Sequence, residues 1–365
     1  MSCCHTKVIC DLTLTLDDGR YCITGGNDRT VRLWNPTRKD PAYKPPPTTN
    51  TIESSTISSQ NYYRNTYGQS QSNTQTELPS ALPMQTYAEG HMHPVHSVAA
   101  NSSSTTLLSC SDKTLVCTDL VTAQVKQKWW GHVARIEYVT CLGGGDADDV
   151  FASASYDSTV RLWDSRSKSK DPLMILEDAK DAVTCVSSVA GEPQIVTSSV
   201  DGKIRTYDLR TAQLITQNIG HPITSFSFGF DSTTYAASCL DGGIRLVDYQ
   251  TNRADRRKVW QIMNSLHKAG NYKLECTFTS DDKYVISGSE CGAMVAYPVQ
   301  DPVSSTASRQ MTESKSVKLE KHTAPTCSVA ACPQSSRPWL ALSASYDGSA
   351  LVWASYNEAE RCLEE

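Results

Sequence analysis

The sequence predicts an all-β chain that folds as a seven-bladed β-propeller, a ring of four-stranded antiparallel sheets. Three observations lead to this prediction. A strand-like phrase recurs along the chain, it can be counted seven times, and its turn residues between Asp112 and Asp241 lie about 40 to 45 residues apart. That spacing is the period of a four-stranded propeller blade.

The recurring phrase combines a β-rich run, small residues, an Asp and a short alternating strand that ends in an aromatic residue. In its clearest copy, Ala152–Asp164, the turn residue is Asp157 and the aromatic residue is Trp163. Successive side chains of a strand face opposite ways, so Val160 and Leu162 should pack against one neighbouring blade and Trp163 on the other face. The other copies centre on Asp28 with Trp34, Asp112, Asp201, Asp241, and Asp347 with Trp353.

Taken in order, the phrases divide the chain into seven blades. In blade one the third strand ends at Trp34, and the outer strand appears only at Met84–Tyr87. The remaining blades are expected at residues 91–128, 131–176, 178–218, 221–262, 271–320 and 322–365. The whole chain, 1–365, is therefore interpreted as one propeller domain.

Two polar inserts interrupt this pattern. Residues 36–82 are rich in Ser, Thr, Asn, Gln, Tyr and Pro, and they contain too few aliphatic residues to offset the entropy of ordering. We expect this insert, between the third and fourth strands of blade one, to be disordered. Residues 301–315 form a second insert at the same step of blade six. Tolerated loop growth explains both inserts, and a phosphorylatable docking tail is the functional alternative.

Composition narrows the class of protein. Charged residues make up 20% of the chain and the formal net charge is −5, which indicates no general attraction to nucleic acid or anionic membranes. No apolar run approaches the ~18 residues of a membrane span, and the N-terminus lacks the pattern of a signal peptide. The 14 cysteines include no CxxC pair, so we expect reduced, mostly buried thiols in an intracellular protein.

The recurring phrase resembles the WD repeat. A His precedes many of the turn Asp residues by about 20 to 25 residues, as His132, His221 and His322 do. In WD repeats this His reaches the Asp through a hydrogen-bonded chain with a strand Ser or Thr and the Trp. The resemblance therefore implies that His132, Asp157 and Trp163, with their counterparts in other blades, form buried structural networks.

Phrases specific to single blades narrow the resemblance. They are Asp18–Cys22, Val31–Pro36, Leu176–Val183, Ser199–Arg210, Pro222–Thr224 and Tyr272–Cys276, the last of which ordinary WD repeats lack. On these phrases the chain resembles the mitogen-activated protein kinase organizer family, also called WD repeat-containing protein 83. The resemblance implies a non-catalytic scaffold that organises kinase-cascade components in the cytoplasm and associates with the spliceosome in the nucleus. Its partners would be other proteins, bound by a monomeric propeller without a small-molecule substrate.

The chain departs from the family pattern at the long blade-one insert, at Cys291, which replaces the blade-six Asp, and at its start. The family supplies the outermost strand of blade seven from upstream residues, and here only residues 1–6 precede Lys7. Three alternatives follow: residues 356–362 complete blade seven, that blade has three strands, or the sequence is an incomplete gene model. An open edge would give fast hydrogen exchange at Leu351–Trp353.

Motifs for catalysis or metal binding are weak or absent. His91, His93 and His96 resemble a metal cluster, but one of them falls where a repeat begins, and no Cys or carboxylate lies beside them at ligand spacing. Most His and turn Asp residues belong to the repeats, and no GxSxG, Walker-type or dinucleotide motif is present. We therefore expect no metal, no cofactor and no enzyme activity.

Candidate partner-binding residues are Trp130, Arg166, Arg210, Arg256 and Arg257. Because strand side chains alternate, one residue of Trp129–Trp130 must face outward, and a surface Trp is a favoured partner anchor. The segments ending at Arg166 and Arg210 resemble the W-D-x-R box in substrate receptors of cullin-RING ubiquitin ligases, although the motif is short and common among WD proteins, so an ordinary strand end is the default interpretation. Arg256 and Arg257 lie in a basic run whose default interpretation is a solvated turn, so direct RNA contact is not expected.

Overall fold

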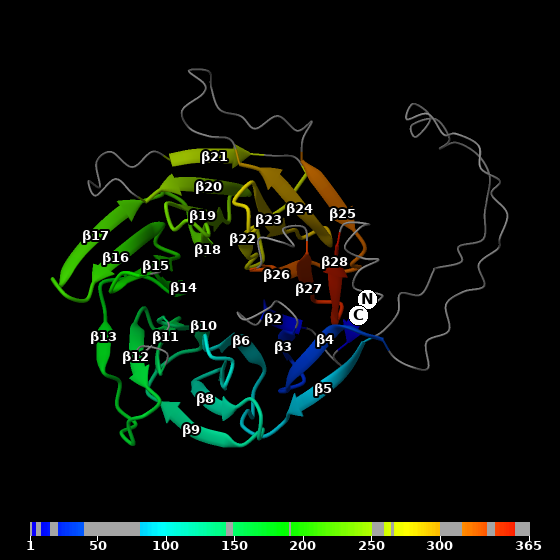
Figure 1. Ribbon diagram of the computed structural model, residues 1–365. Helices are drawn as coiled ribbons and strands as arrows, with labels where there is room; N and C mark the ends of the chain where they lie inside the picture. The colour runs from blue at the N-terminus through cyan, green and yellow to red at the C-terminus, as the bar shows by residue number, and fades with distance from the viewer. Residues whose placement is uncertain are drawn as a thin grey trace, which may run out of the picture.

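The computed structural model describes residues 2–4, 9–14, 21–39, 81–143, 149–189, 191–249, 259–263, 266–299, 316–333 and 340–354. These residues form 28 strands and no helix, and the strands make seven four-stranded sheets arranged in a ring (Figure 1). Every sheet is antiparallel, and six of the seven use four strands that are consecutive in the chain. The predicted seven-bladed propeller is confirmed.

The first four blades contain β2 to β17, from the inner to the outer strand of each blade. Blade one comprises β2 (Ile9–Leu14), β3 (Cys22–Gly26), β4 (Val31–Lys39) and β5 (Ala81–Tyr87). Blade two comprises β6 (Val95–Ala100), β7 (Thr106–Ser111), β8 (Thr114–Asp119) and β9 (Val125–Trp130). Blade three comprises β10 (Ile136–Cys141), β11 (Val150–Ser155), β12 (Val160–Asp164) and β13 (Met174–Leu176). Blade four comprises β14 (Val183–Ser188), β15 (Gln194–Ser199), β16 (Lys203–Asp208) and β17 (Gln213–Asn218).

The last three blades contain β18 to β28 and, in blade seven, also β1. Blade five comprises β18 (Ile223–Phe228), β19 (Thr234–Cys239), β20 (Gly243–Asp248) and β21 (Val259–Met263). Blade six comprises β22 (Cys276–Phe278), β23 (Tyr284–Gly288), β24 (Ala293–Pro298) and β25 (Val317–Glu320). Blade seven comprises β26 (Thr326–Ala331), β27 (Ala341–Ser345), β28 (Ser349–Trp353) and β1 (Ser2–Cys4).

The blade-one insert is shorter than the predicted 36–82. Strand β4 continues to Lys39 and β5 already begins at Ala81, and these two residues face each other in the ladder. Residues 36–39 and 81–82 therefore lie in strands, where the ladder can supply hydrogen-bond partners for the backbone, although their polar composition predicted a loop. Residues 40–80 and the whole of the second insert, 301–315, lie outside the described residues.

The hydrophobic core lies between the blades. Among the described residues there are seven core clusters, and each joins the facing surfaces of two successive blades. Side-chain alternation produces this arrangement: Val160 and Leu162 of β12 pack toward blade four, whereas Trp163 packs with Trp129 toward blade two. A blade therefore buries both of its faces only when it has a neighbour on each side.

Left-handed residues make the tight turns between the second and third strands. Gly202 and Gly292, each the residue after the expected turn position, have φ of 76° and 79°. A Cβ at Gly292 would lie 2.5 Å from the carbonyl oxygen of His322 in the next blade. Glycine is therefore favoured there by the backbone conformation and by the close approach of a neighbouring chain.

The ring is closed by its first strand. β1 pairs antiparallel with β28, with Ser2 opposite Leu351 and Cys4 opposite Ser349, so blade seven has four strands. Of the three alternatives, a three-stranded blade seven is therefore wrong, because a three-residue strand pairs with β28. Residues 356–362, the other candidate for this position, lie outside the described residues.

Pairing with β1 protects those amides of β28 that point away from β27. We expect that deleting residues 2–6 will accelerate exchange at these amides toward the rate of an open edge, because β28 then becomes the outermost strand of its sheet. Exchange measured by mass spectrometry should change little in β12 of blade three, which serves as the internal control. Equal protection of β28 with and without residues 2–6 would contradict the observed closure.

Candidate interaction surfaces and the central channel

Blades three and seven each contain a complete hydrogen-bonded chain of His, Ser, Trp and Asp. In blade three His132 Nδ1 lies 2.8 Å from Asp157 Oδ2, and its Nε2 lies 2.8 Å from Ser153 Oγ. Trp163 Nε1 donates to the same hydroxyl at 2.9 Å. Because a carboxylate only accepts, a neutral His132 carries its proton on Nδ1, and the Ser153 hydroxyl donates to Nε2. Every polar atom of this buried chain therefore has a partner.

Blade seven repeats this arrangement. His322 Nδ1 lies 3.1 Å from Asp347 Oδ2, its Nε2 lies 2.8 Å from Ser343 Oγ, and Trp353 Nε1 donates to Ser343 at 2.8 Å. In both blades the carboxylate also accepts the backbone N–H of the residue after the His. The contacts tie the start of a blade to its own second hairpin, which is a structural role.

In blades one, four and five the turn Asp is bonded to an Arg four residues later. Asp28 accepts from Arg32 at 3.0 Å, and Asp201 and Asp241 accept from Arg205 and Arg245 at 2.6 Å. Burial alone would raise the pKa of Asp201 and Asp241, but the hydrogen bonds from Arg and from backbone N–H groups, together with the Arg charge, outweigh it and hold both pKa values below their usual range. Trp34 in blade one donates to Thr24 at 2.8 Å. In blade five His221 Nδ1 also lies near the turn carboxylate, 3.7 Å from Asp241 Oδ2, which is beyond hydrogen-bond distance, so the arginine is the closer partner.

Blade two departs from the expected network. The ladder pairs Ser111 with Thr114, so Asp112 lies in a two-residue hairpin turn, and His91 contacts Ser111 and Ser109 instead, at 2.9 and 2.7 Å. Burial, followed by nearby Lys128, lowers the pKa of His91 to about 4, so this His is neutral at neutral pH. Both of its ring nitrogens are engaged, which leaves neither for a metal. The described residues contain no group of three or more His, Cys, Asp or Glu side chains suited to a metal ion.

Blade six replaces the missing Asp with a neighbouring carboxylate. Cys291 occupies the expected position, is exposed, and contacts Ser289 at 3.2 Å. Glu290, one residue earlier, accepts the backbone N–H groups of Gly270, Asn271 and Tyr272. Blade six therefore anchors the loop that leads into its inner strand by a different residue.

The inner strands of successive blades are joined by hydroxyl groups that donate to carbonyl oxygens. Thr184 donates to Ile223 O and Thr224 donates to Leu274 O, both at 3.0 Å. Both Thr residues lie at a β-bulge of their strand, where the ladder register shifts. A bulge re-aims a side chain, and here it turns a hydroxyl toward the next blade.

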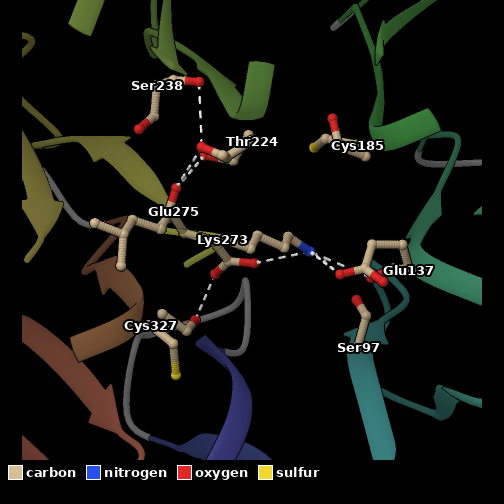
Figure 2. Close-up of polar contacts among 12 residues, drawn as sticks. Ser97, Glu137, Cys185, Thr224, Ser238, Lys273, Glu275 and Cys327 are labelled. Carbon is tan, nitrogen blue, oxygen red and sulfur yellow. Dashed lines mark hydrogen bonds and ion pairs between the residues drawn. The ribbon is translucent and has the colours of Figure 1, made fainter. Parts of the chain in front are cut away.

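A lysine crosses the central channel from blade six to blade three. Lys273 Nζ lies 3.3 Å from the carbonyl oxygen of Glu137 and 3.7 Å from its carboxylate, and it also lies 3.7 Å from the Glu275 carboxylate (Figure 2). Glu137 is bonded to Arg135 at 3.0 Å, and Glu275 accepts the Ser328 hydroxyl at 2.5 Å. Three blades are thus connected through one mostly buried ionic group.

Next to this group lies a cavity of about 760 Å³. Its walls come from the inner strands of blades two to seven and the turns that follow them, and include Tyr138, Leu142, Val189, Phe228, Glu275 and Ala331. Tyr138 also lies under the Lys273 ammonium, 5.3 Å from the ring centroid. The cavity is lined by apolar and small polar side chains and is bordered by the Lys273 group.

The predicted partner-binding residues lie on the outer surface where the structure describes them. Trp129 is buried in the core between blades two and three, whereas Trp130 is 54% exposed. Arg166 is exposed and contacts Asp164 at 3.4 Å, and Arg210 is exposed on the next blade. Arg256 and Arg257 lie outside the described residues.

The central ionic group was not predicted from the sequence. The phrase Tyr272–Cys276 is distinctive, but no role was expected for Lys273 or Glu275. The partner Glu137 lies in blade three, and nothing local marks it as the acceptor for a lysine 136 residues away. The signal that the sequence does contain is the presence of two charged residues, Lys273 and Glu275, in the otherwise apolar segment that leads into β22.

Replacing Asp157 with Asn should weaken the blade-three chain. Asp157→Asn leaves the His132 ring without its carboxylate acceptor, so we expect the free energy of unfolding at neutral pH to fall by about 1 to 3 kcal/mol. Urea denaturation monitored by Trp fluorescence measures this change. Glu177→Gln, at an exposed carboxylate in the same part of the chain, is the control and should match the wild type.

The same variant should flatten the acid side of the stability profile. Burial alone would raise the pKa of Asp157, but hydrogen bonds from His132 and Thr159 hold it below its usual range. Its contribution is therefore present above the unfolded pKa of about 4 and is lost as pH falls below that value. Wild-type stability should decrease more steeply than that of Asp157→Asn below about pH 4, and identical slopes would refute this assignment.

Removing the lysine charge should destabilise the ring. Lys273→Met leaves the Glu275 carboxylate without its cation, and we expect a loss of about 1 to 3 kcal/mol in the free energy of unfolding. Glu275→Gln in the same chain should recover part of that loss, because the uncompensated charge is then gone. Additive effects in this double-mutant cycle would show that the two groups do not interact.

Comparison with known proteins agrees with this structure. A family model described as WD domain, G-beta repeat matches residues 2–35, 82–119, 124–164, 170–208, 212–248 and 313–354, which is more than half of the chain. Most of blade six falls between the matched segments. That blade nevertheless has four strands, so the departure of its turn sequence did not change its architecture.

Several relatives carry the name of the predicted family. A WD repeat domain-containing protein 83 homolog of Dictyostelium discoideum is 26% identical over 302 residues, 75% of this chain and 76% of the relative. WD repeat domain-containing protein 83 of Rattus norvegicus is 35% identical over 35% of this chain and 38% of its own length. The pre-mRNA-splicing factor cwf17 of Schizosaccharomyces pombe is 33% identical over 28% of each chain. With its repeats matched over more than half its length, the chain belongs to the WD-repeat family and is similar to WD repeat domain-containing protein 83 homologues.

Proposed function

We propose that this propeller is a non-catalytic scaffold for protein complexes of pre-mRNA splicing, acting in the nucleus and also present in the cytoplasm. The observation that carries the scaffold role is the use of its polar side chains. The His, Asp and Ser groups of blades three and seven, and the central Lys273 group, bond to one another within the ring. Groups bonded in this way stabilise single blades, in the case of the His networks, or join blades, in the case of Lys273, which leaves recognition to the outer surfaces.

The geometry favours several partners at once. A closed ring is stiff, because each blade is packed on both sides, and it offers two broad faces and a long perimeter. The splicing assignment is supported by similarity to a protein named as a pre-mRNA-splicing factor. Organisation of a kinase cascade is the second candidate, favoured by the similarity to WD repeat domain-containing protein 83.

The ligase-receptor alternative has weaker support. Arg166, the last residue of the first W-D-x-R-like segment, contacts Asp164 and also lies 3.7 Å from Asp149. A guanidinium engaged by two carboxylates of its own blade must break those contacts before it reaches an adaptor. We therefore place this function after the two scaffold roles.

Proximity labelling of the full-length chain in its native cell tests the proposal. We expect splicing proteins to dominate the labelled set, because stable scaffolds remain beside their partners. A set dominated by kinase-cascade proteins without splicing proteins would overturn the splicing assignment in favour of the second candidate.

Two variants examine the ligase alternative in the same experiment. Arg166→Ala and Arg210→Ala remove the adaptor-binding side chains of that motif and should leave the labelled splicing proteins unchanged. Recovery of a ligase adaptor from the wild type, and its loss from these variants, would overturn the scaffold proposal. Thermal unfolding of each variant confirms that the fold is retained, since both side chains are exposed.

A further inference from the structure

The cavity in the central channel opens at one end of the ring. Its lining comes from the C-terminal halves of the inner strands of blades two to seven and from the connections that follow them. In β10 the lining begins at Tyr138, one residue after Glu137, so the Lys273 group lies at the other end of the cavity. Phe230 and Glu192, both in connections, are exposed and mark the open end. With a volume of about 760 Å³, the cavity has the size of a ligand site.

Four hydroxyl groups surround this cavity at one level, and we call them the hydroxyl ring. They come from the same position of the inner strands in blades three to six, because the ladders pair them with equivalent residues of the second strands. The connections begin two residues further on, so the ring lies about 7 Å inside the open end. The same position in blades two and seven holds Ala99 and Ala330. The residues of the hydroxyl ring are Thr140, Ser187, Ser227 and Thr277.

The hydroxyl ring presents hydrogen-bond acceptors to the cavity. Each of its hydroxyls donates its own proton to the carbonyl oxygen of the next residue, at distances between 3.2 and 3.4 Å. A hydroxyl whose proton is used in this way can still accept through its oxygen lone pairs. Among the described residues of the lining, the charged side chains are Glu275 and Glu192, and both are carboxylates. The cavity therefore suits a ligand group that is rich in donors.

The connections around the open end are acidic. In their described parts the single basic residue is Lys283, which pairs with Asp281 at 3.3 Å, so the charges of Glu192, Asp231 and Asp282 are not neutralised there. The complete sequences of these seven connections contain nine acidic residues and three basic ones. They comprise residues 15–21, 101–105, 142–149, 189–193, 229–233, 279–283 and 332–340.

Basic residues at the same end of the ring lie further from the channel. They belong to the connections that follow the third strands, which run in the same direction as the inner strands. Third strands lie two strand spacings, about 10 Å, outside the inner strands. Physiological salt largely screens exposed charges over such a distance. A ligand at the channel therefore meets the acidic rim first. The described basic residues at this perimeter include Arg166, Lys168, Lys170 and Arg210.

We propose that the open end of the central channel binds a basic segment of a partner protein and that one arginine side chain of this segment enters the cavity. The guanidinium group donates to the hydroxyl ring, and its five N–H donors reach acceptors on more than one blade. The aliphatic part of the side chain packs against walls such as Val189 and Phe228, and neighbouring basic residues of the segment face Glu192 and Asp231. The inference deepens the scaffold role proposed above and rests on it for its biological meaning.

The chemistry of the cavity selects against other ligands. Nucleic acid carries phosphates, which the acidic rim repels. A lysine offers three donors at one point, so it engages fewer of the ring hydroxyls than a planar guanidinium does. The Lys273 ammonium lies about 10 Å from the ring, since Thr140 is three residues beyond Glu137. The carboxylates of Glu137 and Glu275 neutralise this ammonium, so it does not prevent entry of a second cation.

Binding of defined peptides to the purified full-length chain tests the proposal. The probe is a short fluorescein-labelled peptide in which one Arg lies between two Lys in a background of Gly and Ser. Companion peptides carry citrulline, which has the size of Arg without its charge, or Ala in place of the Arg. We expect saturable anisotropy changes with the Arg peptide, about tenfold weaker binding of the companions, and weaker binding at high salt. Agmatine, a free guanidinium on an aliphatic stem, should compete only at much higher concentration than the peptide.

A double variant locates the arginine at the hydroxyl ring. Ser187→Ala with Ser227→Ala removes two acceptors and should weaken binding of the Arg peptide about tenfold. Binding of the Ala peptide should not change, because that peptide places no side chain at the ring. A general loss of structure would weaken both peptides. The matched control is Ser167→Ala with Ser169→Ala in a perimeter connection, which should bind as the wild type does.

A charge reversal examines the acidic rim. Glu192→Lys should weaken binding of the Arg and Ala peptides alike, because both carry the flanking Lys residues. The control is Glu177→Lys, the same change at an exposed carboxylate that follows the outer strand of blade three, and it should leave binding unchanged. Thermal unfolding verifies the fold of every variant.

Several outcomes would overturn the proposal. They are equal binding of the Arg and citrulline peptides, or unchanged binding of the Arg peptide in the double serine variant. Agmatine that competes as well as the peptide would assign the cavity to a small cation instead of a partner protein. Concentration-dependent dimerisation lost in Glu192→Lys would replace the partner by a second copy of the chain.

Labelling in cells separates this inference from the scaffold role. If the double serine variant and Glu192→Lys label the same proteins as the wild type, no partner uses the cavity, but the scaffold role stands. If the wild type labels no splicing or kinase-cascade proteins while the Arg peptide still binds, the scaffold role fails instead. Loss of a defined subset of labelled proteins in both variants supports the two proposals together.

Discussion

Closure of the ring is the constraint on which the rest of this structure depends. Each blade has two apolar faces, and the core consists of the layers between successive blades, so an open ring would expose the facing surfaces of blades one and seven. The pairing of β1 with β28 joins the two ends of the described chain within one sheet. Those three residue pairs therefore protect the layer formed by Trp34, Cys332 and Leu342, which lies far from β1 in the sequence.

Two kinds of side-chain contact stabilise the turn between the second and third strands of the blades. Asp157 and Asp347 accept from a histidine that comes from the start of their own blade, whereas Asp201 and Asp241 accept from an arginine four residues later. Either donor lowers the free energy of a carboxylate that is partly removed from water. A His beside an Asp and a Ser resembles a catalytic arrangement, but here each member is held by the others in the interior. The resemblance reflects the shared need to satisfy buried polar atoms.

The features that could be predicted from the sequence are local ones. Asp157 and Trp163 lie within one hairpin, so the phrase that contains them reveals both the turn and the direction in which the side chains point. Closure could not be predicted in this way, because three residues, Ser2–Cys4, are too few to show a strand pattern. The bridge from Lys273 to Glu137 depends on the curvature of the whole ring, which places blades three and six across the channel from each other. Asp112 was expected to bond to the His of its blade, but it does not. The turn of blade two has one residue fewer than that of blade three, so Ser111 and not Asp112 contacts His91.

The division between interior and surface also limits where specificity can arise. Side chains that hold blades together cannot be altered for a new partner without a loss of stability, since each satisfies a buried neighbour. The exposed side chains of the outer strands do not hold buried neighbours in place, and they differ from blade to blade. β9 presents lysines and Trp130, β25 presents alternating charge, and β13 presents only apolar side chains. An edge of that kind favours unwanted pairing when it is left uncovered. Here the strand is only three residues long and is flanked by the exposed carboxylates of Asp171, Glu177 and Asp178, and short length and flanking charge are both means by which proteins limit edge-to-edge pairing.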